Sequence, residues 1–239
     1  MGRRATRSAA LAAIASRSIV PGLASIHYVD ATVAAAALSA ADPRLGAFIQ
    51  VAGPYEPRPR TGDAFASLSR AILFQQLAGR AAAAIHARFV DAIGGQVTPH
   101  AVLAASPETL RAAGLSANKA AALRDLATKA LDGTVPLADL SALDDEDIIA
   151  RLSTVRGIGR WTAEMFLIFE LQRPDVWPVD DLGVRHGWSL IHSLPTTITP
   201  AALRQAGEPL RPYRSLAAWY CWRAVSLYRG GMVLPEAAS

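Results

Sequence analysis

Residues 152–163 read LSTVRGIGRWTA, and this stretch decides the fold class that we expect. Two glycines, Gly157 and Gly159, flank Ile158 directly before an apolar helical pattern. Because glycine permits positive φ and a close approach to the backbone, the stretch predicts a tight turn between two helices. Ile158 is expected to fill the core beneath the turn, so that the amides opening the second helix point outward, where the helix dipole favours an anion. A plain interhelical turn is the simpler alternative. We predict phosphate contacts from Arg156, Gly157, Ile158, Gly159, Arg160 and Thr162.

The rest of the chain is also predicted to be helical. Alanine, leucine and arginine dominate it, and these residues favour helix. Alternating β-branched runs and Asn-Gly or Asp-Gly hairpin turns, which would indicate strands, are nearly absent. Helix starts are indicated by capping residues or by a cap followed by proline. These starts are Asp30, Asp63, Ser106-Pro107, Ser116, Asp144 and Thr199-Pro200. The expected fold class is therefore all-α.

Composition limits the function classes. The chain has 239 residues, of which 51% are hydrophobic and 18% charged, so it has enough apolar residues for a globular core. Its formal net charge of +4 suggests a polyanionic partner without establishing one. Cys221 is the only cysteine, which excludes an intramolecular disulfide and a cysteine-ligated iron–sulfur cluster. The histidine spacing does not support a zinc hydrolase or deaminase, and we expect no redox cofactor.

The N-terminal region admits two interpretations. Residues 1–18 place three arginines before an alanine-rich stretch, which resembles a weak signal or transit peptide. We favour a frayed basic arm or an over-long start, with residues 1–25 disordered; an exported helical protein is the alternative. No apolar run reaches the roughly 18–20 residues of a membrane span, so we expect no membrane partner. The expected protein is a cytoplasmic, nucleoid-associated monomer.

The stretch at 152–163 resembles the helix–hairpin–helix motif of the base-excision DNA glycosylase superfamily. Residues 174–181, PDVWPVDD, resemble the loop and aspartate that complete that superfamily's signature. The 3-methyladenine DNA glycosylase II branch is also similar at AILFQQLAGRAA (71–82), LRAAGLSANKAAAL (110–123) and RPYRSLAAWYCWR (211–223). The resemblance covers roughly residues 40–230. It implies a two-lobed helix–hairpin–helix fold with an interdomain cleft, built from a 66–176 bundle and from a lobe of residues 1–65 and 177–239.

Paired aspartates end the second of these stretches. Either Asp180 or Asp181 can cap the following helix, while a neighbour points elsewhere. Breaking an N-glycosidic bond builds positive charge on the deoxyribose, which a fixed carboxylate stabilises while it orients the attacking water. Counted without gaps from Trp161, the family's catalytic aspartate falls on Asp181. Asp180 then becomes the cap or a supporting residue, and a one-residue shift would exchange the two.

All five tryptophans lie in the last third of the chain. An enzyme that flips a base out of DNA needs aromatic side chains on which the base can stack. The resemblance places Trp161 at the wall of a base pocket and Trp222 against the flipped nucleotide. Met165 occupies the position of a pocket tyrosine of some relatives. The side chain that fills the hole left in DNA is placed at Gln76, with Leu77 as the alternative.

The resemblance implies a monofunctional hydrolase that acts on alkylated purines, such as 3-methyladenine and 7-methylguanine, in double-stranded DNA. Trp161 stands where lyase-type relatives carry a lysine, so no Schiff-base nucleophile is evident. The family's hairpin often holds a monovalent cation, here expected as Na⁺ or K⁺ at the backbone of Val155 and Ile158. Two alternatives remain: a non-catalytic helix–hairpin–helix DNA-binding module, and a glycosylase for other damaged bases.

Overall fold

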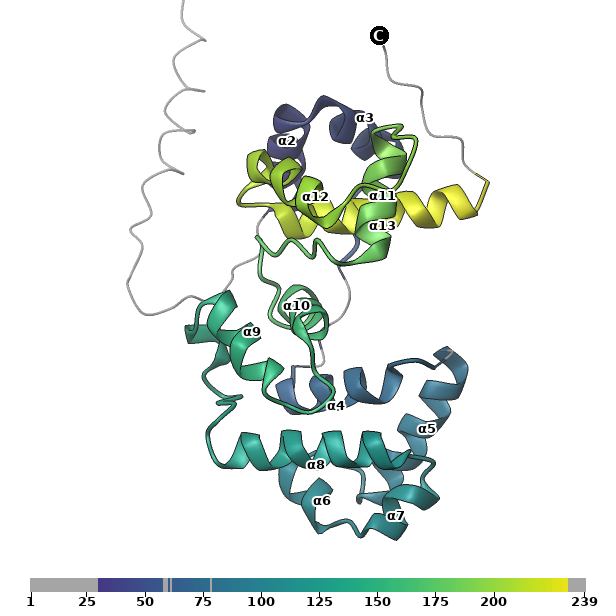
Figure 1. The fold of residues 1–239 in the computed structure, drawn as a ribbon, viewed down its shortest axis with the longest axis vertical. Helices are drawn as coiled ribbons and strands as arrows, with labels where there is room; N and C mark the ends of the chain where they lie inside the picture. The colour runs from purple at the N-terminus through teal and green to yellow at the C-terminus, as the bar shows by residue number, and fades with distance from the viewer. Residues whose placement is uncertain (1–29, 58–59, 61, 78, 232–239) are drawn as a thin grey trace, which may run out of the picture.

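A computed structural model describes residues 30–231 except residues 58–59, 61 and 78 (Figure 1). The predictions for residues 1–25 lie outside the described residues. The part of the chain that the structure describes contains helices and no strands, which confirms the all-α class. None of its helices has the length and hydropathy needed to cross a membrane.

The α-helices follow one another along the chain with short connections. They are α2 (Ala31–Ala41), α3 (Pro43–Ala52), α4 (Ala64–Phe74), α5 (Gly79–Ala92), α6 (Pro99–Ala104), α7 (Pro107–Ala112), α8 (Ala117–Leu131), α9 (Asp145–Ser153), α10 (Arg160–Phe169), α11 (Leu182–Ile191), α12 (Pro200–Ala206) and α13 (Arg214–Arg229). Two 3₁₀ turns, η1 (Leu140–Ala142) and η2 (Glu208–Leu210), complete the set.

Local capping explains most helix starts. The side chains of Asp30, Asp63, Ser106, Ser116 and Thr199 each accept a hydrogen bond from an amide in the first turn. These predicted starts are confirmed. The predicted start at position 144 is also found, although its aspartate makes no capping bond.

Two helices lie where the sequence analysis predicted none. They are α3 and α6, and both begin with a cap followed by proline, namely Asp42-Pro43 and Thr98-Pro99. The same signal marks the start of α7, so the local sequence is sufficient to predict both helices.

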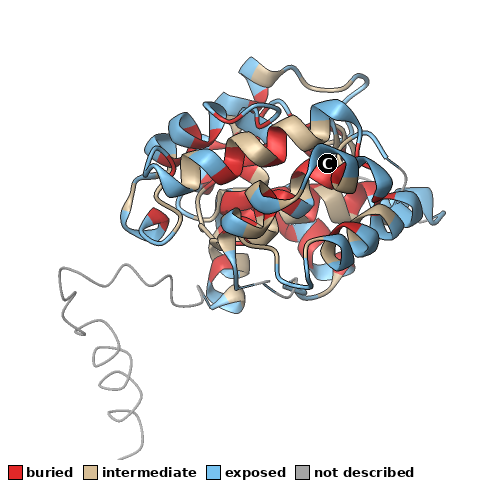
Figure 2. Cartoon of the chain, turned by 90° about the horizontal axis from the view of Figure 1, so that it is seen from below, coloured by how far each residue is buried: buried red, intermediate tan, exposed pale blue. Residues whose placement is uncertain are grey.

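Buried side chains form two hydrophobic clusters, which define two lobes. The first lobe is built from α4 to α10 and runs from Phe65 to Val176. The second joins α2 and α3 to α11, α12 and α13, with members at positions 38–52 and 177–224. Figure 1 shows the second lobe above, the first below and α10 between them, and Figure 2 shows buried positions gathered toward the inside of the molecule with exposed ones around them. Trp222 packs against both clusters.

One glycine brings two helices of the second lobe into close contact. A Cβ at Gly187 of α11 would lie 1.9 Å from the carbonyl oxygen of Cys221 on α13. Any larger residue would therefore force the helices apart. This approach holds the middle of α11 against the middle of α13; one turn earlier, Gly183 lies against Trp222, where the candidate site is found.

Candidate active site

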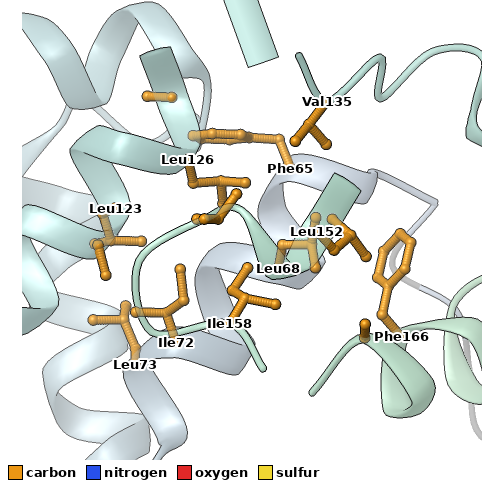
Figure 3. Packing of buried hydrophobic residues seen from close by; sticks show 14 of the residues in the cluster. Phe65, Leu68, Ile72, Leu73, Leu123, Leu126, Val135, Leu152, Ile158 and Phe166 are labelled. Atoms are coloured by element: carbon orange, nitrogen blue, oxygen red, sulfur yellow. The ribbon is translucent and has the colours of Figure 1, made fainter. Parts of the chain in front are cut away.

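The turn between α9 and α10 has the conformation that its glycines predict. Gly157 has a φ of +80°, and the amide of Ile158 donates to the carbonyl of Val155 at 3.0 Å. Ile158 is 3% exposed and lies among Leu68, Ile72 and other apolar side chains of the first lobe (Figure 3). Its burial under the turn agrees with the expectation from sequence.

Helix α10 begins without a side-chain cap, because its N-cap residue is Gly159. The first amides of the helix are therefore not occupied by a capping side chain, as a phosphate-binding helix end requires. Arg156 is exposed, and its guanidinium donates to the side chain of Asn118 at 3.0 Å. Thr162 is buried, with its hydroxyl 3.4 Å from the Gln75 amide.

Arg160, which is expected to contact a phosphate, makes side-chain bonds within the protein. Its guanidinium donates to both carboxylate oxygens of Glu146, at 3.0 and 2.5 Å, and to Glu164 at 3.1 Å. Glu146 lies on the preceding helix, α9, and Glu164 lies one turn further along α10. Arg160 is thus paired with acidic side chains although its own side chain is 51% exposed, whereas Arg156 is exposed and bonded to a neutral side chain.

Asp181 is the best-held polar group of the site. It is 9% exposed and caps α11, with Oδ1 accepting from the amide of Val184 at 2.8 Å. The indole Nε1 of Trp222 donates to the same oxygen at 2.9 Å, and the indole Nε1 of Trp161 donates to Oδ2 at 2.6 Å. The structure thus joins three predicted residues that are far apart in the chain. Only Oδ2 remains with a single protein donor.

The cap of α11 is Asp181 itself, which corrects the expectation that Asp180 takes this part. One oxygen of the Asp181 carboxylate is enough for the cap, so the other remains directed to the lobe junction. Asp180 is exposed. Its charge contributes to the raised pKa of the neighbouring Glu164, which burial and further acidic neighbours move to about 7 against the counteracting Arg160.

The predicted aromatic residues lie around the carboxylate in different ways. Trp161 is 48% exposed at the start of α10, so part of this residue is accessible to a partner. Trp222 is half-buried and its ring lies 5.5 Å from that of Phe169. Met165 follows Trp161 by one helical turn and is half-buried against the first cluster.

Two hollows lie between the lobes near the site. One, of about 90 Å³, is lined by aromatic and apolar residues of α2, α10 and α13. The other, of about 710 Å³, is lined mainly by charged residues of α9, α10 and the loop that follows α10. Asp181 lines neither of these two hollows.

The loop from α4 to α5 carries the predicted DNA wedge. Gln76 and Leu77 are both exposed, and Gln76 has a φ of +56°. The preceding Gln75 turns inward and donates from Nε2 to the carbonyl of Gly157 at 2.9 Å. The wedge loop and the glycine turn are therefore neighbours in space, although 82 residues separate them in the chain.

Three residues of the site region were missed by sequence analysis. They are Gln75, Lys119 and Glu164, each of which makes its polar contacts inside the first lobe. For Glu164 a signal exists, because this carboxyl stands between buried apolar positions on α10. For the other two residues, the contacts depend on packing between separate helices.

Comparisons with known proteins agree with this geometry. A family model described as HhH-GPD superfamily base excision DNA repair protein matches residues 69–212. The chain belongs to this superfamily.

Relatives with solved structures share most of the chain. DNA-3-methyladenine glycosylase 1 of Schizosaccharomyces pombe is 36% identical over 195 residues, which cover 80% of this chain and 86% of that protein. A structure of the S. pombe 3-methyladenine DNA glycosylase in complex with abasic DNA has a TM-score of 0.71 and 37% identity, and covers 80% of this chain and 95% of that one. The crystal structure of a Bacillus halodurans DNA-3-methyladenine glycosidase has a TM-score of 0.77 and 32% identity, with 82% and 91% of the chains covered.

Proposed function

We propose that the protein is a monofunctional DNA glycosylase that hydrolyses the N-glycosidic bond of alkylated purines in duplex DNA during base-excision repair. The observation that carries this proposal is the carboxylate of Asp181, held by the indole N–H groups of Trp161 and Trp222 at the junction of the two lobes. Phosphate binding by a helix–hairpin–helix turn requires no such carboxylate. The relatives named as 3-methyladenine DNA glycosylases support the choice of substrate class.

Asp181 acts on the sugar rather than on the base. As the bond between the base nitrogen and C1′ breaks, its electron pair leaves with the base and C1′ becomes positively charged. The carboxylate oxygen Oδ2 stabilises this charge and orients the water that adds to C1′. An alkylated purine is already cationic and leaves readily, so the site needs little acid catalysis of departure. The half-exposed ring of Trp161 stacks on the cationic base.

The glycine turn holds the DNA while this chemistry occurs. The uncapped amides at the start of α10 and the exposed guanidinium of Arg156 bind a phosphate group. We also propose that Na⁺ or K⁺ binds at the carbonyl oxygens of Val155 and Ile158, since monovalent cations take such ligands. The Val155 carbonyl accepts one bond, from the Ile158 amide, and keeps a second lone pair for a cation.

The positions of the two lysines bear on the products of the reaction. Lys119 and Lys129 are the only lysines of the chain, and each donates to backbone carbonyls of the first lobe. Neither is thus presented as a Schiff-base nucleophile, so we propose no strand cleavage by the enzyme itself.

The proposed form of the protein is a monomer that acts in the cytoplasm, on the nucleoid.

A pair of neighbouring variants tests the proposal. Wild type, Asp181→Asn and the matched control Asp180→Asn are incubated with duplex DNA carrying 7-methylguanine, and free base is quantified. Asparagine is also a good N-cap, so Asp181→Asn should fold. We expect base release from wild type and Asp180→Asn, its loss in Asp181→Asn, and strand scission only after alkali.

Two results would overturn parts of the proposal. If Asp180→Asn alone abolishes base release, the catalytic carboxylate is assigned to the wrong aspartate. If wild type binds DNA but releases no base from this duplex or from methylated DNA, the protein is a DNA-binding module and not an enzyme.

A further inference from the structure

The tip of the loop between α4 and α5 has a strained backbone. Gln76 has a φ of +56°, a region that residues with side chains seldom adopt, and its side chain is exposed. Leu77 beside it is 38% exposed. Strain of this kind persists only where neighbouring groups hold the backbone in place. The question is therefore which groups hold this tip.

Lys119 provides the first hold. This residue lies in the first turn of α8, and its Nζ donates to the carbonyls of Leu73 at 2.5 Å and Gln75 at 3.1 Å. The last carbonyls of a helix have no partner within the helix, and those at the end of α4 find one here. The ammonium group thus fixes the direction in which the chain leaves α4.

The side chain of Gln75 provides the second hold. Its Nε2 donates to the carbonyl of Gly157 at 2.9 Å and lies 3.4 Å from the hydroxyl of Thr162. The loop is therefore fastened directly to the glycine turn and to the first turn of α10. A Cβ added at Gly157 would lie 3.6 Å from the Cβ of Ala122 on α8. The loop, the glycine turn and α8 therefore meet at this point.

Helix α8 also holds the glycine turn from its other end. Oδ2 of Asp125 accepts from the backbone amide of Arg156 at 2.7 Å and from Nζ of Lys129 at 2.9 Å. Lys129 donates in addition to the carbonyl of Thr154. One helix therefore braces the wedge loop through Lys119 and the phosphate-binding turn through Asp125, about 9 Å apart along its axis.

We propose that Gln75 and Lys119 are positioning residues for base extrusion. They hold the exposed Gln76 at a fixed distance from the glycine turn. When the turn binds a DNA phosphate, the side chain of Gln76 is therefore in position to enter the base stack. This inference rests on the proposed function. It adds two residues that contact neither the base nor the sugar and that act through the residue entering the DNA.

The test separates extrusion from chemistry. Lys119→Met and Gln75→Met keep the side-chain length and remove the donors. Base release is measured in single turnovers on 7-methylguanine paired with cytosine and on the same base left unpaired in a bulge. Because extrusion is costly only for a stacked and paired base, we expect a loss of about 10-fold or more on the paired substrate and less than about threefold on the bulge.

Matched controls identify a general loss of stability. Arg124→Met removes another donor of the same helix, whose guanidinium bonds the carbonyls of Leu103 and Ala105 instead of the loop or the glycine turn, and it should leave the ratio of the two rates as in wild type. Lys119→Arg should restore most of the loss, because a guanidinium can donate to both carbonyls. If Lys119→Met fails to fold, Gln75→Met decides the matter. Equal losses on paired and bulged substrates in Gln75→Met would overturn the proposal.

A binding measurement distinguishes this inference from the proposed function. Duplex DNA with 2-aminopurine beside a non-hydrolysable abasic analogue should brighten on binding wild type and much less on binding Gln75→Met, at saturating protein. If wild type brightens the probe but releases no base, the proposed function fails and the positioning role remains. If both proteins brighten the probe equally, the positioning role is refuted.

Discussion

Replacement of Glu164 by glutamine should make the folded protein less sensitive to pH. The side chain of Glu164 is 6% exposed on α10, and its Oε1 accepts from Nε of Arg160 at 3.1 Å. Burial is the main cause that raises its pKa to about 7, with Asp180 and Glu146 adding to the effect and Arg160 opposing it. Glutamine keeps the acceptor oxygen for Arg160 and removes the ionisation.

The sign follows from proton binding in the two states. Below the ordinary pKa of 4.5 the carboxyl is protonated in both the folded and the unfolded chain, so its ionisation does not change the free energy of unfolding. Between 4.5 and about 7 the unfolded chain is ionised and the folded chain is not, so the free energy of unfolding falls as pH rises. The full difference corresponds to about 3 kcal/mol, at about 1.4 kcal/mol for each pH unit.

Urea unfolding at a series of pH values measures this effect. Between pH 5 and pH 8, the stability of Glu164→Gln relative to wild type should increase by about 2 to 3 kcal/mol. Glu170→Gln is the matched control, because Glu170 is a second buried carboxyl next to the end of α10, where it accepts from the amide of Gly62. This control should keep the pH slope that Glu164 causes. Identical slopes for wild type and Glu164→Gln would refute the reasoning.

Three more predictions concern the held carboxylate and the second lobe. Gly183→Ala should reduce base release by about 10- to 100-fold, because the new Cβ would lie 3.0 Å from Oδ1 of Asp181. Thermal melting should show that the fold is intact. Unchanged single-turnover rates would contradict this prediction. Trp161→Phe should lower the rate about 10-fold and hardly change the melting temperature, since it loses the donor to Oδ2 from a ring that is 48% exposed. For Asp42, burial opposes ionisation, but hydrogen bonds from His192 and from a backbone amide outweigh it and hold the pKa below 3.8. Asp42→Asn should therefore cost about 2 kcal/mol in urea unfolding at neutral pH, a difference that shrinks as pH falls below 3.8; a constant difference would contradict the linkage.

Local interactions made much of the fold predictable. The caps at Asp30, Asp63 and Ser116 satisfy amides two or three residues away, so the sequence alone indicates where those helices begin. The glycine turn is equally local, since its conformation depends on Gly157 and on an apolar residue next to it. The all-α class and the pair of aspartates follow from the same kind of short-range pattern.

Tertiary packing decided how the site is assembled. The sequence pattern left either aspartate as the cap, and the structure assigns that part to Asp181, whose partners Trp161 and Trp222 come from two other helices. It also turns Arg160 toward acidic side chains within the first lobe.

By itself, the sequence determined the class of fold, most helix starts, the glycine turn and a choice between two aspartates. Only the tertiary structure decided that Lys119 holds the end of α4 and that Gln75 reaches the glycine turn. The physical reason is the range of the interactions. Caps and turns join groups a few residues apart along the backbone, whereas these contacts join residues 46 and 82 positions apart and exist only once the apolar faces of separate helices have packed.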